Sequence, residues 1–170
     1  FCKNEKKKPC LIVFDSHPDC MEPMKEPTHE EWLSKVVEEG FPGENILLVG
    51  LRNSHKDEIK FIKENKIKTL SISNIVEELQ EMCDTIMEFS SGKELYVSID
   101  IDVIDPSFAP STGYPEQGGL TSRQFLYLIQ RIKKIKTLRA VDIVEINEKM
   151  DKQNNNMTVK LGAKILAELL

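Results

Sequence analysis

"LYVSIDI" (95–101) is a short run rich in branched apolar residues that turns acidic towards its end. Four other stretches share this character: LIVFDS (11–16), NILLVG (45–50), TLSI (69–72) and LRAVDIVEI (138–146). Runs that are apolar on both faces are typical of interior strands in a parallel sheet. The sequence therefore predicts several buried parallel strands.

Amphipathic helical patterns separate these strands. The expected helices cover residues 28–40, 54–65, 74–89, 121–135 and 157–170. Thr28 with Glu31 and Thr121 with Gln124 form candidate capping boxes, and Ser54 is a candidate N-cap. Alternating strands and helices predict right-handed crossovers and a three-layer αβα fold with a mostly parallel sheet. We expect one α/β domain over residues 1–170.

Composition limits the possible partners. The net charge of -5 argues against nucleic acid, which needs a basic face. No apolar run approaches the roughly 20 residues that a membrane span requires, so we expect no membrane partner. The four cysteines form no CxxC pair, and this usage suits reduced thiols in the cytoplasm.

Polar side chains gather at the predicted carboxyl ends of three strands. They are Asp15, His17 and Asp19, then Asp100 and Asp102, then Glu145. Alternate residues of an extended chain point to one side. Ligands of open α/β sheets bind outside the carboxyl ends of the strands. We therefore expect these side chains to converge on one site.

Such a cluster of carboxylates needs a positive partner because like charges in contact repel one another. Oxygen ligands with a minority of imidazole suit manganese or magnesium. The number of carboxylates favours two ions about 3.5–4 Å apart, which would lower the pKa of a bound water and supply hydroxide. The pattern therefore indicates a metal-dependent hydrolase.

Each of these residues also has a purely structural interpretation. An isolated Asp-x-Asp often begins a loop or caps a helix, and a lone histidine such as His17 is more often a structural residue. Asp105 precedes a proline and is expected to form a turn. Asp142 and Asn147 are expected to satisfy local backbone groups. The combination of acidic clusters at the ends of strands in one sheet favours the metal site.

At these positions the sequence resembles the ureohydrolase family, which includes arginase, agmatinase and formimidoylglutamase. "DSHPD" (15–19) is similar to the family motif Asp-Ala-His-x-Asp. "SIDIDVIDPSFAPSTGYPEQGG" (98–119) is similar to its long Ser-x-Asp-x-Asp signature. "DIVEIN" (142–147) matches the segment with the catalytic-pocket glutamate, and "VGLRN" (49–53) resembles a further segment. The resemblance runs from about residue 11 to 170.

The resemblance implies a binuclear manganese (Mn2+) centre. Asp15 and Asp100 would bridge the two ions. Asp19 would complete the ligand set of one ion, and His17 with Asp102 that of the other. A bridging hydroxide would attack the carbon of a guanidino or amidino compound, and urea or a related small amide would leave.

The resemblance also implies residues for the substrate. Glu145 would hold the guanidinium by charge-assisted hydrogen bonds. His29 would shuttle protons or contact the substrate, although its alternative is a structural place in the first turn of a helix. Thr112, Gly113 and Tyr114 would line the wall of the pocket.

Three departures separate this sequence from the family pattern. The family has a Gly-Gly-Asp-His motif before the first strand, and its histidine is a metal ligand. Here ten residues precede that strand and none is histidine. We therefore expect a domain incomplete at its N-terminus, with one metal site short of a ligand. Tyr114 stands where the family usually has threonine, and His55 stands where arginases have an aspartate that contacts the amino group of the substrate. Both departures disfavour arginine as the substrate.

The leading hypothesis is a manganese-dependent hydrolase of linear C–N bonds in a guanidino or amidino compound. One alternative is a non-catalytic relative that acts as a subunit or binding module. Another is a binuclear metal phosphoesterase, although nothing in the sequence resembles a phosphate-binding glycine loop. The family is usually trimeric or hexameric, so we expect a homo-oligomer.

Overall fold

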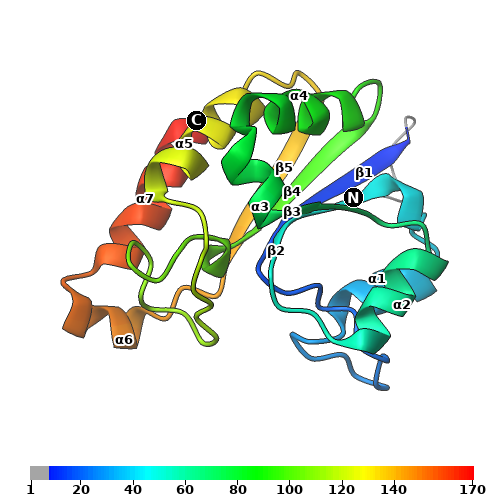
Figure 1. The fold of residues 1–170 in the computed structure, drawn as a ribbon, viewed down its shortest axis with the longest axis horizontal. Helices are drawn as coiled ribbons and strands as arrows, with labels where there is room; N and C mark the ends of the chain where they lie inside the picture. Colours follow the sequence, from blue (N-terminus) through cyan, green and yellow to red (C-terminus); the bar gives the residue numbers. More distant parts are fainter. Residues whose placement is uncertain (1–7) are drawn as a thin grey trace.

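The computed structural model describes residues 8–170, apart from the side chain of Val76. The fold has three layers, with a sheet in the middle and helices on both of its faces (Figure 1). The strands are β1 (Pro9–Phe14), β2 (Ile46–Leu51), β3 (Lys68–Ser71), β4 (Glu94–Asp100) and β5 (Leu138–Val144). They lie in the order β3-β2-β1-β4-β5, and every neighbouring pair is parallel. The predicted α/β fold with a parallel sheet is confirmed.

The strand order creates a switch point at the centre of the sheet. From β1 the chain builds outwards through β2 to the edge strand β3, then returns to place β4 on the other side of β1. The connections that leave β1 and β4 therefore diverge, which opens a crevice at their carboxyl ends. Asp15 directly follows β1 and Asp100 ends β4, so the topology brings both to this crevice.

Helices cover the two faces of the sheet unequally. One face carries α3 (Ile72–Glu77), α4 (Leu79–Phe89), α5 (Ser122–Ile132) and α7 (Met157–Leu169), and the other carries α1 (Trp32–Glu38) and α2 (Lys56–Glu64) (Figure 1). On the second face, Leu11 and Leu48 of β1 and β2 pack with Leu33 of α1. Ser98 and Asp142, from β4 and β5, line a cavity on this face instead. The expected helical cover on both faces is therefore partial.

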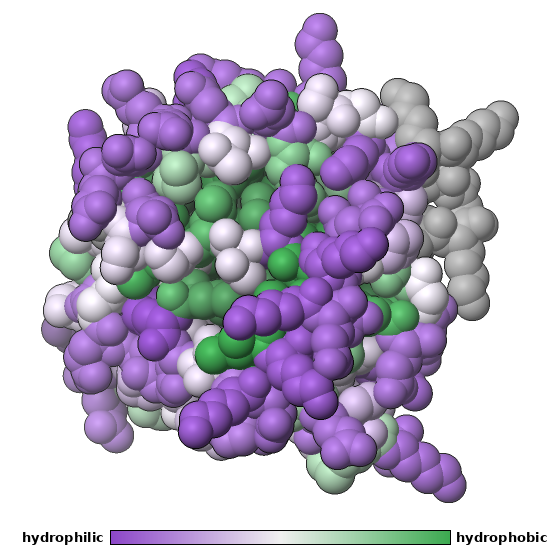
Figure 2. Space-filling model, turned by 45° about the vertical axis from the view of Figure 1, so that its right-hand side comes forward, coloured by the Kyte–Doolittle hydropathy of each residue, from purple (hydrophilic) through white to green (hydrophobic). Residues whose placement is uncertain are grey.

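Shorter elements complete the chain. They are the 3-10 turns η1 (Gly43–Asn45), η2 (Ile101–Val103) and η3 (Lys152–Asn154) and the short helix α6 (Glu148–Asp151). Within residues 8–170, no helix is long and apolar enough to cross a membrane. On the face shown in Figure 2, apolar side chains gather in the centre, and hydrophilic side chains surround and partly cover them.

Two helix starts differ from the prediction. The N–H of Thr28 donates to Glu31 at 2.7 Å as expected, but residues 29–31 form a turn and α1 begins only at Trp32. His55, not Ser54, caps α2, because its Nδ1 accepts the N–H of Asp57 at 3.4 Å. An imidazole nitrogen can therefore serve where a hydroxyl was expected.

The predicted helix 74–89 is two helices that meet at Glu78. The apolar residues of both helices face the same core, since Ile75 of α3 and Ile86 of α4 belong to one hydrophobic cluster. The capping box of Thr121 and Gln124 at α5 is confirmed.

The long connection 103–120 is held by hydrogen bonds to Asp105. The carboxylate of Asp105 accepts the N–H groups of Ser107 at 2.9 Å, Gly118 at 2.8 Å and Gly119 at 3.2 Å. These bonds confirm the prediction that Asp105 forms a turn.

Candidate metal centre and substrate pocket

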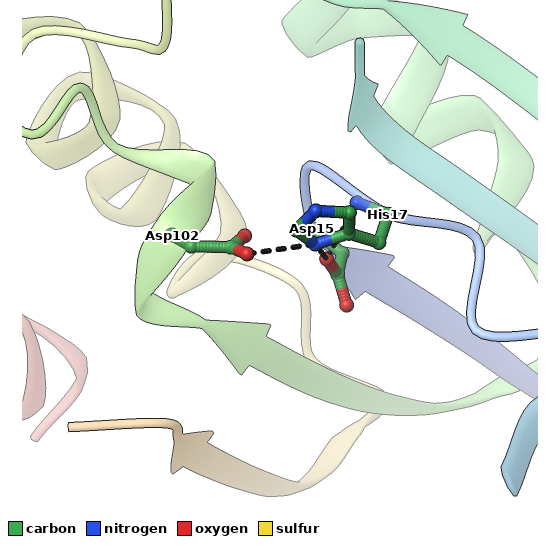
Figure 3. A group of neighbouring side chains, drawn as sticks. All are labelled: Asp15, His17 and Asp102. Carbon is green, nitrogen blue, oxygen red and sulfur yellow. Dashed lines mark hydrogen bonds and ion pairs between the residues drawn. The ribbon is translucent and has the colours of Figure 1, made fainter. Parts of the chain in front are cut away.

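Two loops at the switch point bring Asp15, His17 and Asp102 together. Asp15 and His17 follow β1, whereas Asp102 lies in η2 directly after β4. One ligand atom of each residue lies within 4.8 Å of the others, and Figure 3 shows their side chains pointing toward one another. The structure therefore assembles three of the five residues that the sequence proposed as metal ligands.

Backbone amides orient the carboxylates of this group. The N–H of His17 donates to Asp15 Oδ1 at 2.7 Å. The N–H of Ser16 donates to Asp102 Oδ1 at 3.0 Å, and the N–H of Asp102 donates to Asp100 Oδ1 at 2.8 Å. Because these donors belong to the main chain, the fold itself sets the direction of all three carboxylates.

Asp15 and Asp100 are buried carboxylates with too little positive charge around them. They are 2% and 6% exposed. Burial, together with repulsion from neighbouring carboxylates, raises the pKa of Asp15 to about 8 and that of Asp100 to about 9. A positive charge at this position would stabilise the ionised form of both carboxylates. This electrostatic environment favours binding of a divalent cation.

Within the group of Asp15, His17 and Asp102, the positive charge comes from the imidazole of His17. Its Nδ1 lies 2.9 Å from Asp102 Oδ2 and 3.6 Å from Asp15 Oδ1. These contacts raise the pKa of His17 to about 11. Burial opposes ionisation of Asp102, but hydrogen bonds from His17 and Ser16 outweigh it and lower the pKa of Asp102. A metal must therefore displace a proton to bind the imidazole.

Asp19 and Asp100 lie on the wall of the same cavity but outside the three-residue group. Asp19 has a left-handed backbone with φ 49°, and its Oδ2 accepts the indole N–H of Trp32 at 2.9 Å. Burial raises the pKa of Asp19 to about 6. Its role as a metal ligand stays a prediction.

The cavity beside this group has a volume of about 970 Å³. All five proposed metal ligands line it, as do His29, Thr112, Tyr114 and Glu145. A β-carbon added to Gly113 would lie 3.4 Å from Glu145 Oε2, so this carboxylate lies beside Gly113. Among the described residues that line the cavity there is no lysine or arginine, so its charge favours a cationic ligand.

Two aromatic rings form part of the cavity wall. The rings of His29 and Tyr114 stack with centroids 5.5 Å apart and an angle of 26° between their planes. Both residues are exposed, so the pair lies at the solvent side of the cavity.

Glu145 follows β5 in a left-handed conformation with φ 62°. His55 is exposed at the start of α2 and does not line the cavity.

Arg52, within the VGLRN segment, makes contacts that the sequence did not predict. Its guanidinium donates to the backbone carbonyls of Asp102, of Glu116 at 2.8 Å and of Gln117 at 3.2 Å. It therefore ties the end of β2 to the long loop, whose Glu116 lies 3.7 Å from His17 Nε2. A β-carbon at Gly119 would lie 2.5 Å from the backbone nitrogen of Asp105 and 2.8 Å from the Arg52 guanidinium, which explains the glycine there.

The expectation for Asp142 is wrong, whereas that for Asn147 is confirmed. Asp142 lies opposite Ser98 in the register of β4 and β5, on the cavity face. Its carboxylate accepts the hydroxyls of Ser98, at 2.8 Å, and Tyr96, so its partners are side chains of the next strand rather than local backbone. Asn147 does serve its own backbone, since it accepts the N–H of Met150 at 3.1 Å.

These features define a class: a parallel α/β protein with a carboxylate-rich site at its switch point, suited to divalent cations. The sequence pattern of the arginase family matches residues 1–170, so the chain belongs to that family. Agmatinase from Bacillus subtilis (strain 168) is 32% identical over 173 residues, which cover 97% of this chain and 56% of that protein. Arginase from Staphylococcus aureus (strain MRSA252) is 29% identical over 163 residues, which cover 85% and 54%.

Solved structures agree with the fold. Proclavaminate amidino hydrolase from Streptomyces clavuligerus matches with a TM-score of 0.85 and 27% identity, over 95% of this chain and 55% of that one. Formimidoylglutamase from Bacillus subtilis matches with a TM-score of 0.90 over 99% and 54%, and at 22% identity it supports the fold alone. The chain spans about half the length of the curated relatives it matches. The resemblance inferred from the sequence motifs is confirmed.

Proposed function

We propose that the protein is a manganese-dependent hydrolase of linear C–N bonds in guanidino or amidino compounds. The observation that carries this proposal is the group of Asp15, His17 and Asp102 beside buried Asp100, in a cavity whose charge favours cations. Membership of the arginase family and similarity to an agmatinase and an amidino hydrolase support the substrate class.

The donor set fits manganese. Asp15 and Asp100 would bridge two ions, Asp19 would bind one of them, and His17 with Asp102 the other. Carboxylate oxygens with a single imidazole suit this hard cation, and its charge would keep the buried carboxylates ionised at neutral pH. When bound, the ions lower the pKa of water and supply hydroxide at neutral pH.

The chain's own residues would bind and orient the substrate. Glu145, beside Gly113, would accept hydrogen bonds from the guanidinium. Thr112, which is buried, would support the wall on which Tyr114 is exposed. His29, on the solvent side of the cavity, would carry a proton between solvent and the leaving amine.

We also infer that the whole protein acts in the cytoplasm as a homo-oligomer. Cys10, Cys20 and Cys83 are buried and free, which suits a reducing compartment. Light scattering of the purified protein tests the oligomeric state, and a monomer at micromolar concentration would contradict it.

Turnover is the direct test of the activity. The protein is loaded with manganese and incubated with a panel of guanidino and amidino compounds, and urea or ammonia release is measured. We expect release that is lost on metal chelation, with the highest rate for compounds that lack a carboxylate. Manganese binding without release from any compound would contradict the hydrolase and favour a binding module. Phosphate release from a phosphoester instead would favour a phosphoesterase.

A further inference from the structure

We propose that Trp32 is a positioning residue that holds the Asp19 carboxylate for metal binding. The indole Nε1–H donates to Asp19 Oδ2 at 2.9 Å, and both residues line the cavity. The proposal rests on the proposed function in one respect, because it takes Asp19 as a metal ligand. No motif in the sequence marks Trp32 for this role.

The main chain of Asp19 is held as well as its side chain. Asp19 has φ 49°, a conformation that residues with a side chain rarely adopt unless their surroundings impose it. Its carbonyl accepts the N–H of Leu33 at 3.1 Å, and Leu33 is a fully buried residue of α1. The first turn of α1 therefore fixes both the main chain and the side chain of Asp19.

A second anchor holds the neighbouring residue from α2. The N–H of Cys20 donates to Glu58 Oε1 at 3.2 Å, while Glu58 Oε2 accepts the N–H of His55 at 2.9 Å. Glu58 is buried and belongs to the capping box of α2. Because this anchor and the Leu33 bond hold the main chain, removal of the indole N–H should release the Asp19 side chain while the loop stays in place.

The indole bonds one oxygen of the carboxylate and so sets the direction of the other. Outer hydrogen-bond partners of metal ligands act in this way, and their loss typically weakens metal affinity about 10- to 100-fold. The same weakening is expected here for the ion that Asp19 binds. The ion bound by His17 and Asp102 should keep its affinity, because neither residue contacts the indole through a hydrogen bond.

The test compares Trp32→Phe with the unchanged protein in manganese titrations followed by electron paramagnetic resonance of free Mn2+. We expect one of the two affinities to fall about 10- to 100-fold. Phe41→Leu is the matched control, since Phe41 lines the same cavity but cannot hydrogen-bond Asp19. A tryptophan isostere with sulfur in place of the indole nitrogen removes the donor alone and should reproduce the loss.

Tryptophan fluorescence adds a second readout, because Trp32 is the single tryptophan of the chain. Paramagnetic manganese at Asp19 should quench the Trp32 fluorescence. In the unchanged protein, the quenching should follow the dissociation constant of the ion whose affinity falls in Trp32→Phe. If the unchanged protein binds two ions and Trp32→Phe or the isostere binds both equally well, the inference is wrong and the proposed function stands. If the unchanged protein binds no manganese, both fail.

Discussion

The two faces of β4 serve different purposes in this molecule. On one face, Val97 and Ile99 are fully buried in the hydrophobic core beneath the helices. On the other, Ser98 and Asp100 line the cavity. Because side chains alternate along a strand, one short segment can stabilise the fold through one face and present polar groups through the other. Stability and chemistry at this site should therefore separate residue by residue.

The largest expected effect is the loss of metal from Asp100→Ala on the cavity face. The substitution removes a proposed bridging charge, so we expect manganese binding to be abolished, as elemental analysis would report. Retention of two manganese ions per chain would contradict the assignment.

On the core face, Ile99→Ala should lower the stability of the protein and leave metal binding intact. A large-to-small change at a fully buried position costs about 2–5 kcal/mol of unfolding free energy. Urea denaturation measures this loss. Below the transition, in the folded protein, manganese affinity should stay within about twofold of the parent. A large change in metal affinity would show that the two faces are coupled.

The third prediction concerns pH. Asp15 and Asp100 have ordinary pKa values of 3.8 and folded values of about 8 and 9, and His17 rises from 6.5 to about 11. Each group binds its proton more tightly in the folded state. Its contribution to stability is therefore full below the ordinary value and is lost as pH rises through the folded value. Asp102, whose pKa is lowered, is ionised in both states above about pH 6 and adds no slope there.

We therefore expect the melting temperature in chelator to fall as pH rises from about 6 to 9. Manganese should remove most of this slope, because it takes the place of the protons. Differential scanning fluorimetry across the range, with and without manganese, makes the comparison. A melting temperature that stays constant in chelator would contradict the proposed electrostatics.

The smallest effect is expected at the solvent side of the cavity. Tyr114→Thr removes the ring stacked on His29, an interaction of a kind worth about 0.5–1.5 kcal/mol. For a substrate that turns over, KM should change about 2- to 10-fold while manganese affinity stays the same. Tyr114→Phe keeps the ring and should resemble the parent. An equal change in both variants would assign the effect to the hydroxyl.

Local patterns in the sequence were sufficient for the strands, for one helix start and for part of the site. The apolar runs predicted the parallel strands, and Thr121 with Gln124 predicted a helix start, because backbone pairing and capping depend on near neighbours. The spacing of Asp15 and His17 placed both after one strand. Such features follow from periodicity and turn chemistry, which a few consecutive residues determine.

Tertiary structure alone decided the rest. The strand order placed β1 beside β4, and only this neighbourhood joins His17 to Asp102. The bond of Trp32 to Asp19 and the bonds of Arg52 to the long loop connect residues from different elements of the fold. No local pattern encodes such contacts, because their partners meet only after the sheet and its helices have packed. The sequence by itself thus determined which ligand types stand at the ends of the strands, and packing determined which of them face one another.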